Sequence, residues 1–114
     1  MSLSRIEKSQ WSEFCRLLNA QLPGQRAEIE VASLELGVQT AVRWLTVIGV
    51  TYDARMDAME LSLDGVDHLI FHPTEVYMES GSGGVESLAI VERDVWQIVT
   101  LRAPLMLPRP AAAV

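Results

Sequence analysis

The two histidines of the chain, His68 and His72, are the side chains whose spacing first suggests chemistry. On a helix, residues four apart share one face, so both rings would be placed to bind one metal ion. On a strand they would share a face but lie roughly 13 Å apart, too far for one ion. The apolar residues between them and the following Pro73 favour extended structure. We therefore predict no metal site, and the segment 66–72 stays open between a short strand and a helical turn.

Carboxylates crowd the same half of the sequence. A calcium loop needs oxygen ligands at alternating positions and a central glycine, but Ala54 and Met56 lie between Asp53 and Asp57. We expect these polar turns to be solvated, which leaves no buried carboxylate pair for acid–base catalysis. What remains is a candidate small-ligand site beside the acidic turn. Its members are Tyr52, Asp53, His68 and His72.

Other reactive features of the sequence have plainer interpretations. The single cysteine, Cys15, excludes an internal disulfide and lies on the apolar side of a predicted helix, far in sequence from either histidine, so we interpret it as a core residue. The glycines at Gly81, Gly83 and Gly84 precede no helix pattern that would receive a phosphate. No serine has the spacing of a nucleophile elbow. The sequence indicates no catalytic residue, no metal ligand and no cofactor.

Tyr77 has the strand parity of Glu75 and so points away from the apolar face formed by Val76 and Met78. An exposed aromatic side chain beside carboxylates is typical of a contact surface. We predict that Tyr77 and Glu75 are interface residues. The remaining large aromatic side chains have periodicities more typical of a core than of a ligand cleft. These are Trp11, Trp44, Trp96 and Tyr52.

A helix near the N-terminus is the first element that must position these residues. Ser4 and Glu7 have the spacing of a capping box, and Ser9 is an alternative start. Pro and Gly in the segment 22–24 end the helix. A helix with one apolar stripe must pack against another element, which here is a sheet. The stripe consists of Trp11, Phe14, Cys15 and Leu18.

The rest of the sequence alternates with a period of two, which predicts strands. The longest run, Val38 to Tyr52, has apolar residues at its even positions and is predicted to be a central or strongly bent strand. Gly49 is the expected place of a kink or of a close backbone approach. A slip of the pattern at Ala32-Ser33 indicates a bulge. Asp64-Gly65 and Arg93-Asp94 are predicted hairpin turns, and Ser80 to Gly84 a flexible loop. The strands are expected near 27–31, 34–36, 38–52, 59–63, 76–79, 88–92 and 95–102.

These elements predict an α+β protein: an N-terminal helix packed on a curved antiparallel sheet or small open barrel of six to seven strands. We expect one domain over residues 1–107 and a frayed tail over 108–114, where proline and alanine dominate.

The composition narrows the class of protein. Of 114 residues, 49% are hydrophobic, too many for a disordered chain. The net charge of −6, with nine basic residues, argues against a nucleic-acid partner. No apolar run approaches the ~20 residues of a membrane span, and the first ten residues lack a signal-peptide core, so we expect a cytoplasmic protein without membrane contact.

Short stretches along the chain also resemble a known family. They are Trp11 with Phe14, Gly49-Val50-Thr51-Tyr52-Asp53, His68-Leu69-Ile70 with Pro73 and Val76, Ile98-Val99, Leu101-Arg102 and Pro104-Leu105. In this order, from Ile6 to Leu107, they resemble a bacterial domain-of-unknown-function family of small uncharacterised proteins of about this length. The family has no assigned activity, so the resemblance implies no function. The chain lacks the proline expected after Ile6, and Thr100 replaces an expected basic residue, which puts in doubt any basic contact on the last strand.

Two functions follow as hypotheses. The first is a non-enzymatic module that self-associates or binds a protein partner; a homo-oligomer is expected, with a dimer favoured, because edge strands and a high apolar content provide surface to bury. The second is a small-ligand binder or minor enzyme, with its site near Tyr52, Asp53, His68 and His72.

Overall fold

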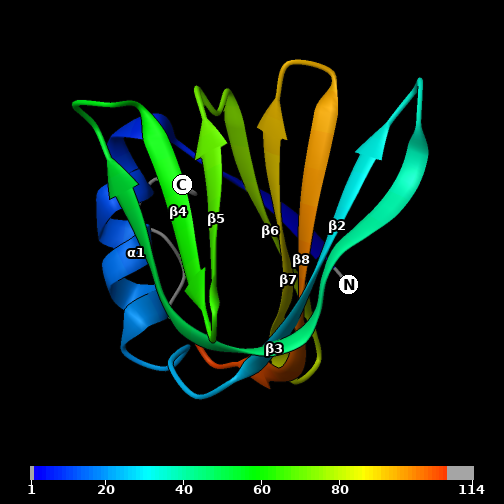
Figure 1. The fold of residues 1–114 in the computed structure, drawn as a ribbon. Helices are drawn as coiled ribbons and strands as arrows, with labels where there is room; N and C mark the ends of the chain where they lie inside the picture. The colour runs from blue at the N-terminus through cyan, green and yellow to red at the C-terminus, as the bar shows by residue number, and fades with distance from the viewer. Residues whose placement is uncertain (1, 108–114) are drawn as a thin grey trace.

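One eight-stranded antiparallel sheet bends over on itself, and a single α-helix lies along one side of it in the described part of the chain (Figure 1). The computed structural model describes residues 2–107. The elements are β1 (Ser2–Ile6), a 3-10 turn (Lys8–Gln10), α1 (Trp11–Asn19), β2 (Arg26–Ser33), β3 (Gly37–Asp53), β4 (Ala58–Leu63), β5 (Val66–Phe71), β6 (Glu75–Gly81), β7 (Gly84–Glu92) and β8 (Val95–Leu105).

Most strands pair with their neighbours in sequence, and the sheet has the order β1-β6-β7-β8-β2-β3-β4-β5. One meander runs from β2 to β5 and a second from β6 to β8, because short hairpin turns connect successive antiparallel strands. The hairpins predicted at Asp64-Gly65 and Arg93-Asp94 are confirmed, with positive φ angles at Gly65 (80°) and Arg93 (54°). Among the strand pairings of residues 2–107, only those of β2 with β8 and of β1 with β6 join distant parts of the chain.

The sheet has two walls that share β3. The large wall consists of β1, β6, β7, β8, β2 and the first half of β3, and the small wall of the second half of β3, β4 and β5 (Figure 1). β3 bends between them: its register against β2 shifts, Trp44 has a φ of 52°, and its register against β4 shifts between Val47 and Gly49. Because extra residues in one strand bend it, these irregularities turn the sheet back over its own inner face. The predicted kink at Gly49 is confirmed.

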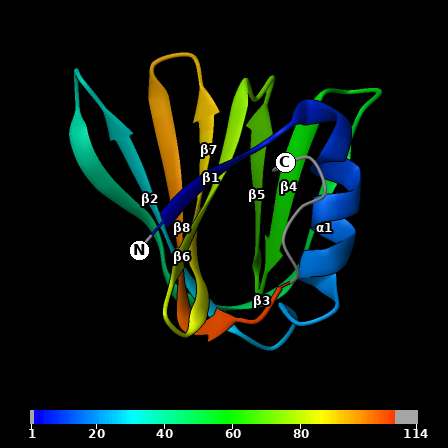
Figure 2. The same ribbon diagram turned by 180° about the vertical axis from the view of Figure 1, so that it is seen from behind.

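The core lies between the two walls and the helix. Inner-face residues of both walls join one cluster, which includes Ile29 and Val99 from the large wall and Leu61 and Ile70 from the small wall. α1 packs against β3, beside the small wall in both views (Figures 1 and 2). The predicted apolar stripe is confirmed, since all four of its residues are buried: Trp11, Phe14, Cys15 and Leu18.

α1 and the loop after it also satisfy backbone groups along one edge of β3. The Asn19 side chain binds the backbone of Val50 twice: Nδ2 donates to the carbonyl oxygen at 2.7 Å, and Oδ1 accepts from the amide at 2.8 Å. Next to it, Val47 exchanges backbone hydrogen bonds with Gly24 and Gln25. The edge of β3 that β2 leaves unpaired is therefore satisfied by α1 and by the loop after it.

The strand count differs from the prediction. Eight strands form instead of six or seven, because Ser2–Ile6 is a strand paired with β6. The capping-box interpretation of Ser4 and Glu7 was wrong: a 3-10 turn follows Glu7, and α1 begins at Trp11 without a side-chain cap. Here the tertiary pairing of β1 outweighs the local capping signal. The open, curved α+β architecture agrees with the prediction.

Several details of the strands also needed correction. The bulge predicted at Ala32-Ser33 was wrong, since β2 continues through Ser33 and the extra residues lie in β3. The even-numbered apolar face of β3 is interrupted, because its bend buries Val47 and exposes Ile48. Leu34 and Leu36 lie in an exposed turn.

Two further segments differ from the prediction or resolve an open alternative, and both contribute to strands. The segment 66–72 forms β5 over Val66–Phe71. The expected flexible loop at 80–84 is a tight hairpin, because β6 continues to Gly81 and β7 starts at Gly84. The predicted frayed tail, 108–114, lies outside the described residues.

Candidate functional site

Three side chains from different elements meet on the carboxylate of Asp57. Tyr52 at the end of β3 donates its hydroxyl to Oδ1 at 2.6 Å. The Nδ1 atom of His72, just after β5, lies 3.3 Å from Oδ2. The Nζ atom of Lys8, before α1, lies 3.5 Å from Oδ1. We call these four residues the Asp57 cluster; it ties the N-terminal segment to the ends of three strands.

Backbone geometry positions this cluster. Asp57 and His72 both have positive φ angles, 50° and 55°, and the amide of His72 donates to the carbonyl of Asp57 at 2.7 Å. Such angles are unfavourable for residues with a Cβ, so the surrounding strand pairing must hold them. Tyr52 packs edge-on against the buried Trp11, with ring centroids 5.1 Å apart. The phenol is therefore fixed on both its apolar and its polar side.

The cluster shifts the acidities of two of its members. The hydrogen bond from Tyr52, with smaller contributions from His72 and Lys8, holds the pKa of Asp57 below its usual range against the opposing effect of burial. Burial, followed by the hydrogen bond to Asp57 and then its negative charge, raises the pKa of Tyr52 to about 12. At neutral pH the phenol is thus a firmly protonated hydrogen-bond donor and Asp57 a firmly ionised acceptor.

The other two residues of the predicted ligand site lie elsewhere. Asp53 caps its own turn, since its Oδ1 accepts from the amides of Arg55 (2.9 Å) and Met56 (3.3 Å). His68 points between the two walls, where its Nε2 lies 2.5 Å from Oε1 of the buried Gln97 in β8. The structure therefore brings Tyr52 and His72 together on a third residue and separates them from Asp53 and His68 in their contacts.

Sequence reasoning missed Asp57, Lys8 and Gln97 as the partners of these residues. The sequence predicts that Asp57 belongs to a solvated acidic turn, and its positive φ has no clear sequence signal. The contacts from Lys8 to Asp57 and from His68 to Gln97 span distant parts of the chain. The parity of Gln97 with Val99 in the last strand was the one available sign that it faces inward.

Cys15 is buried in the core. Removal from water raises the pKa of its thiol to about 12, which keeps the nucleophilic thiolate scarce at neutral pH. Within residues 2–107, no group of three or more His, Cys, Asp or Glu side chains is arranged to hold a metal ion. The same range contains no helix with the length and apolar character needed to cross a membrane.

The predicted interface residues Tyr77 and Glu75 lie on the outer face of the large wall. Tyr77 stacks on Trp96 with ring centroids 5.6 Å apart and 9° between the planes. Its hydroxyl donates to the carboxylate of Glu75, which raises the pKa of the phenol. Val91, opposite Trp96 in the register, is buried on this outer face, apart from the main core. Trp96 itself remains 41% exposed.

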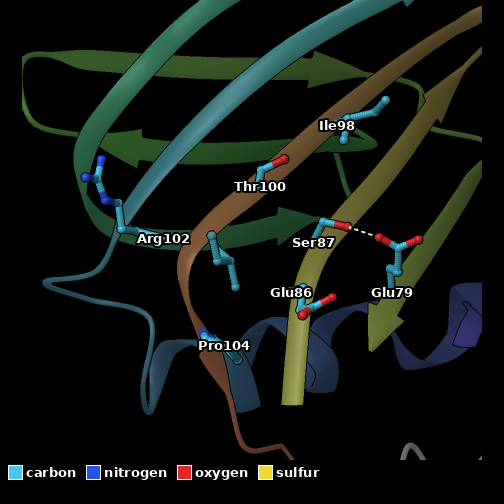
Figure 3. A pocket seen from close by; sticks show the side chains of 8 residues that line it. Glu79, Glu86, Ser87, Ile98, Thr100, Arg102 and Pro104 are labelled. Atoms are coloured by element: carbon cyan, nitrogen blue, oxygen red, sulfur yellow. Dashed lines mark hydrogen bonds between the residues drawn. The ribbon is translucent and has the colours of Figure 1, made fainter. Parts of the chain in front are cut away.

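A groove of about 400 Å³ lies on the same outer face (Figure 3). It opens where β8 separates from β7, since the register between these strands shifts between Val85 and Ser87. Ser87 donates to the Glu79 carboxylate at 3.2 Å, and Figure 3 shows Glu86 beside them with Arg102 pointing away. The lining residues are Glu79, Glu86, Ser87, Ile98, Thr100, Leu101, Arg102 and Pro104.

The terminal strand β5 presents a further exposed feature. Its side chains Leu69 and Phe71 point outward and are 46% and 45% exposed. Its inward neighbour Ile70 is fully buried. β5 pairs only with β4, so its other edge is free within the described sheet.

Comparison with known proteins identifies the family but no activity. Residues 2–110 match the model of a family of unknown function, DUF5335. An uncharacterised protein from Aquifex aeolicus (strain VF5) is 31% identical over 111 residues, covering 96% of this chain and 99% of the relative. No solved structure gives a significant match. The chain therefore belongs to the DUF5335 family, which agrees with the resemblance in its sequence motifs.

Proposed function

We propose that the protein is a non-enzymatic cytoplasmic module that works as a homodimer, with the two copies joined along the free edge of β5. The observation that carries this proposal is a terminal strand with unpaired backbone groups and two exposed apolar side chains, Leu69 and Phe71. Such an edge is a template for pairing with another chain.

The hydrogen-bond pattern identifies which groups of β5 are free. The amide of His72 donates to the carbonyl of Asp57, which continues the β4–β5 register one pair beyond Ala58 and Phe71, and therefore two pairs beyond Met59 and Ile70. Because bonded and non-bonded pairs alternate in antiparallel strands, Ile70, His68 and Val66 bond to β4. The amides and carbonyls of the alternate residues, 67, 69 and 71, point away from β4 and have no backbone partner among residues 2–107.

Two other sheet edges are less suited to pairing than β5. Asn19 occupies the backbone groups of Val50 on the free side of β3. β1, at the opposite end of the sheet, has only five residues and carries the exposed, positively charged Arg5. Short length and positive charge both discourage edge pairing, whereas β5 has six residues, no Lys or Arg, and one acidic residue, Asp67.

β5 is self-complementary about Leu69. If two copies pair antiparallel with Leu69 opposite its own copy, Asp67 lies opposite Phe71 of the second copy. The three residues with free backbone groups would then form about six new hydrogen bonds. The carboxylates of the two Asp67 residues do not face each other, so the one charge on this side of the strand does not oppose pairing. We favour a second copy of the chain as the occupant for this reason.

The test is the oligomeric state of the chain and of two β5 variants, measured by sedimentation velocity from about 1 to about 200 μM, a range suited to a small interface. We expect the wild-type mass to approach twice 12.6 kDa as concentration rises. Leu69→Lys places two like charges opposite each other and should give a monomer. Leu69→Pro removes the amide that faces the second copy without breaking the β4 ladder and should also give a monomer.

Leu3→Lys is the matched control, because Leu3 is an exposed leucine (59%) on the other terminal strand. This variant should dimerise like the wild type. Circular dichroism of each variant establishes that it is folded. A wild-type chain that stays monomeric throughout, or Leu3→Lys dissociating as much as Leu69→Lys, would contradict the proposal. So would a complex of Leu69→Lys that retains the wild-type mass.

A further inference from the structure

We propose a second binding surface, independent of the β5 edge: the outer face of the large wall docks a basic polypeptide segment of a partner protein. The surface extends from the Tyr77–Trp96 stack to the groove that contains Glu79 and Glu86. We call it the acidic face. It lies on a different wall from β5, so neither proposal depends on the other.

The groove gives the surface its shape. Glu79 on β6, Ser87 on β7 and Thr100 on β8 are register partners and therefore form one row across the outer face. Beyond this row, the separation of β8 from β7 opens the cavity of about 400 Å³. Two carboxylates and two hydroxyls line it together with the apolar side chains of Ile98 and Pro104. Apolar walls with acidic groups fit the long aliphatic stem and charged end of lysine or arginine.

Arg5 is the register partner of Tyr77 and lies near the stack, but in the described part of the chain the two carboxylates of the groove have no compensating charge of this kind. Within residues 2–107, no basic side chain forms an ion pair with Glu79 or Glu86. Arg102 lines the groove, but its guanidinium lies over the ring of Trp44, 5.1 Å from the centroid. The chain as a whole has a net charge of −6. A cationic partner would therefore be attracted to this face and would neutralise carboxylates that the protein leaves unpaired.

The aromatic stack supplies a second anchor. Trp96 is 41% exposed and is held flat against Tyr77, whose hydroxyl is bound to Glu75. A guanidinium or ammonium group over such a ring is attracted by its π electrons, and the carboxylate of Glu75 adds to this attraction. Ala89 and Ile98, paired in the register, form the row between Trp96 and Thr100, and Ile98 itself lines the groove. Neither side chain carries a charge that would oppose an extended chain lying across this row.

The register fixes the spacing of the two anchors. Trp96 and Thr100 are four residues apart on β8, which corresponds to about 13 Å along a strand. An extended polypeptide lying along β8 places residues i and i+4 on the same side at the same separation. The acidic face thus fits a segment with two basic residues separated by three others.

The experiment titrates ¹⁵N-labelled protein with an acetylated, amidated peptide Gly-Arg-Ser-Gly-Ser-Arg-Gly and follows amide and indole NMR shifts. We expect shifts at Trp96, Ile98 and Thr100 on β8, with weakening at higher salt. A peptide of the same composition with adjacent arginines should bind less tightly. Titration with spermidine tests whether a small polycation binds as well as a polypeptide does. Spermidine should bind more weakly than the peptide, with NMR shifts confined to the groove. The Leu69→Lys variant should bind equally well, because the β5 edge takes no part.

Paired variants make the result decisive. Glu79→Gln combined with Glu86→Gln should weaken peptide binding about tenfold, as should Trp96→Ala. Glu60→Gln, which removes a carboxylate from β4 in the small wall, is the matched control and should leave binding unchanged within about twofold. Equal weakening by Glu60→Gln, equal affinity for spermidine and both peptides, or no binding at low salt would each overturn the proposal.

Discussion

Tyr52 is the residue whose titration best reports the Asp57 cluster. Its pKa is raised to about 12, first by burial and then by the hydrogen bond to Asp57. A raised pKa means that the folded state favours the neutral phenol. This stabilisation is present below the ordinary pKa of 10.0 and is lost as the pH rises from there to about 12.

Asp57→Asn should lower the pKa of Tyr52 towards 10, because it removes the negative charge next to the hydroxyl while keeping a similar side-chain shape. The chain has two tyrosines, so a Tyr77→Phe background leaves one phenol to follow by its ultraviolet absorbance. Asp53→Asn, which removes a charge that caps its own turn, should lower the pKa less. An unchanged Tyr52 titration in Asp57→Asn would show that burial alone sets its acidity.

At this scale the sequence identified the residue types but not their partners. Cys15 could be assigned to the core because its neighbours have helical periodicity. Tyr52 and His72 could be selected as candidates, but Asp57 joins them only because two residues adopt positive φ angles and bring their strand ends together. His68 pairs with Gln97 across the space between two walls, a contact that no local pattern specifies.

Among the elements, the β6–β7 hairpin has a sharp steric requirement at Gly84. Its φ is 121°, and an added Cβ would overlap the carbonyl of Leu105 in β8. Gly65 in the β4–β5 turn is a matched control, since its φ is also positive (80°) but no atom lies within 4 Å of an added Cβ.

Gly84→Ala should therefore lower the free energy of unfolding by about 3 kcal/mol or more, and Gly65→Ala by roughly 1–2 kcal/mol. Urea denaturation of both variants measures the difference. Equal losses would mean that backbone strain alone, without the Leu105 contact, explains the cost at Gly84.

Local signals located most elements. The apolar stripe predicted α1, and turn dipeptides such as Asp64-Gly65 predicted the hairpins. β1 was missed because its pairing partner, β6, lies some seventy residues further along the chain, while a capping pattern nearby favoured a helix. The two faces of β3 were confused because its bulges shift the parity of buried residues between Val42 and Val47.

For the whole molecule, the two proposed surfaces lie on separate walls. A dimer formed through β5 would carry two acidic faces, one on each copy. A partner with two basic segments would then bind both at once, with an apparent affinity above that of either face alone. The composition predicts one globular domain with apolar surface to bury, but only the sheet order shows that β1 and β5 are the terminal strands.

The two long-range strand pairings described above have a consequence for how the chain folds. β2–β5 and β6–β8 are local meanders, whereas β2 with β8 and β1 with β6 require closure of large loops. Closing such loops is entropically costly, so we expect the β2–β8 seam to form in the rate-limiting step and β1 to add afterwards.

Stopped-flow tryptophan fluorescence can separate these events. Ile29→Val at the seam should slow refolding, whereas Ile6→Val on β1 should leave refolding nearly unchanged and accelerate unfolding instead. The reverse assignment of the two rates would mean that the N-terminal strand belongs to the nucleus. On the expected outcome, β1 joins the sheet after the other strands, and the edge of β6 stays exposed until β1 has paired with it.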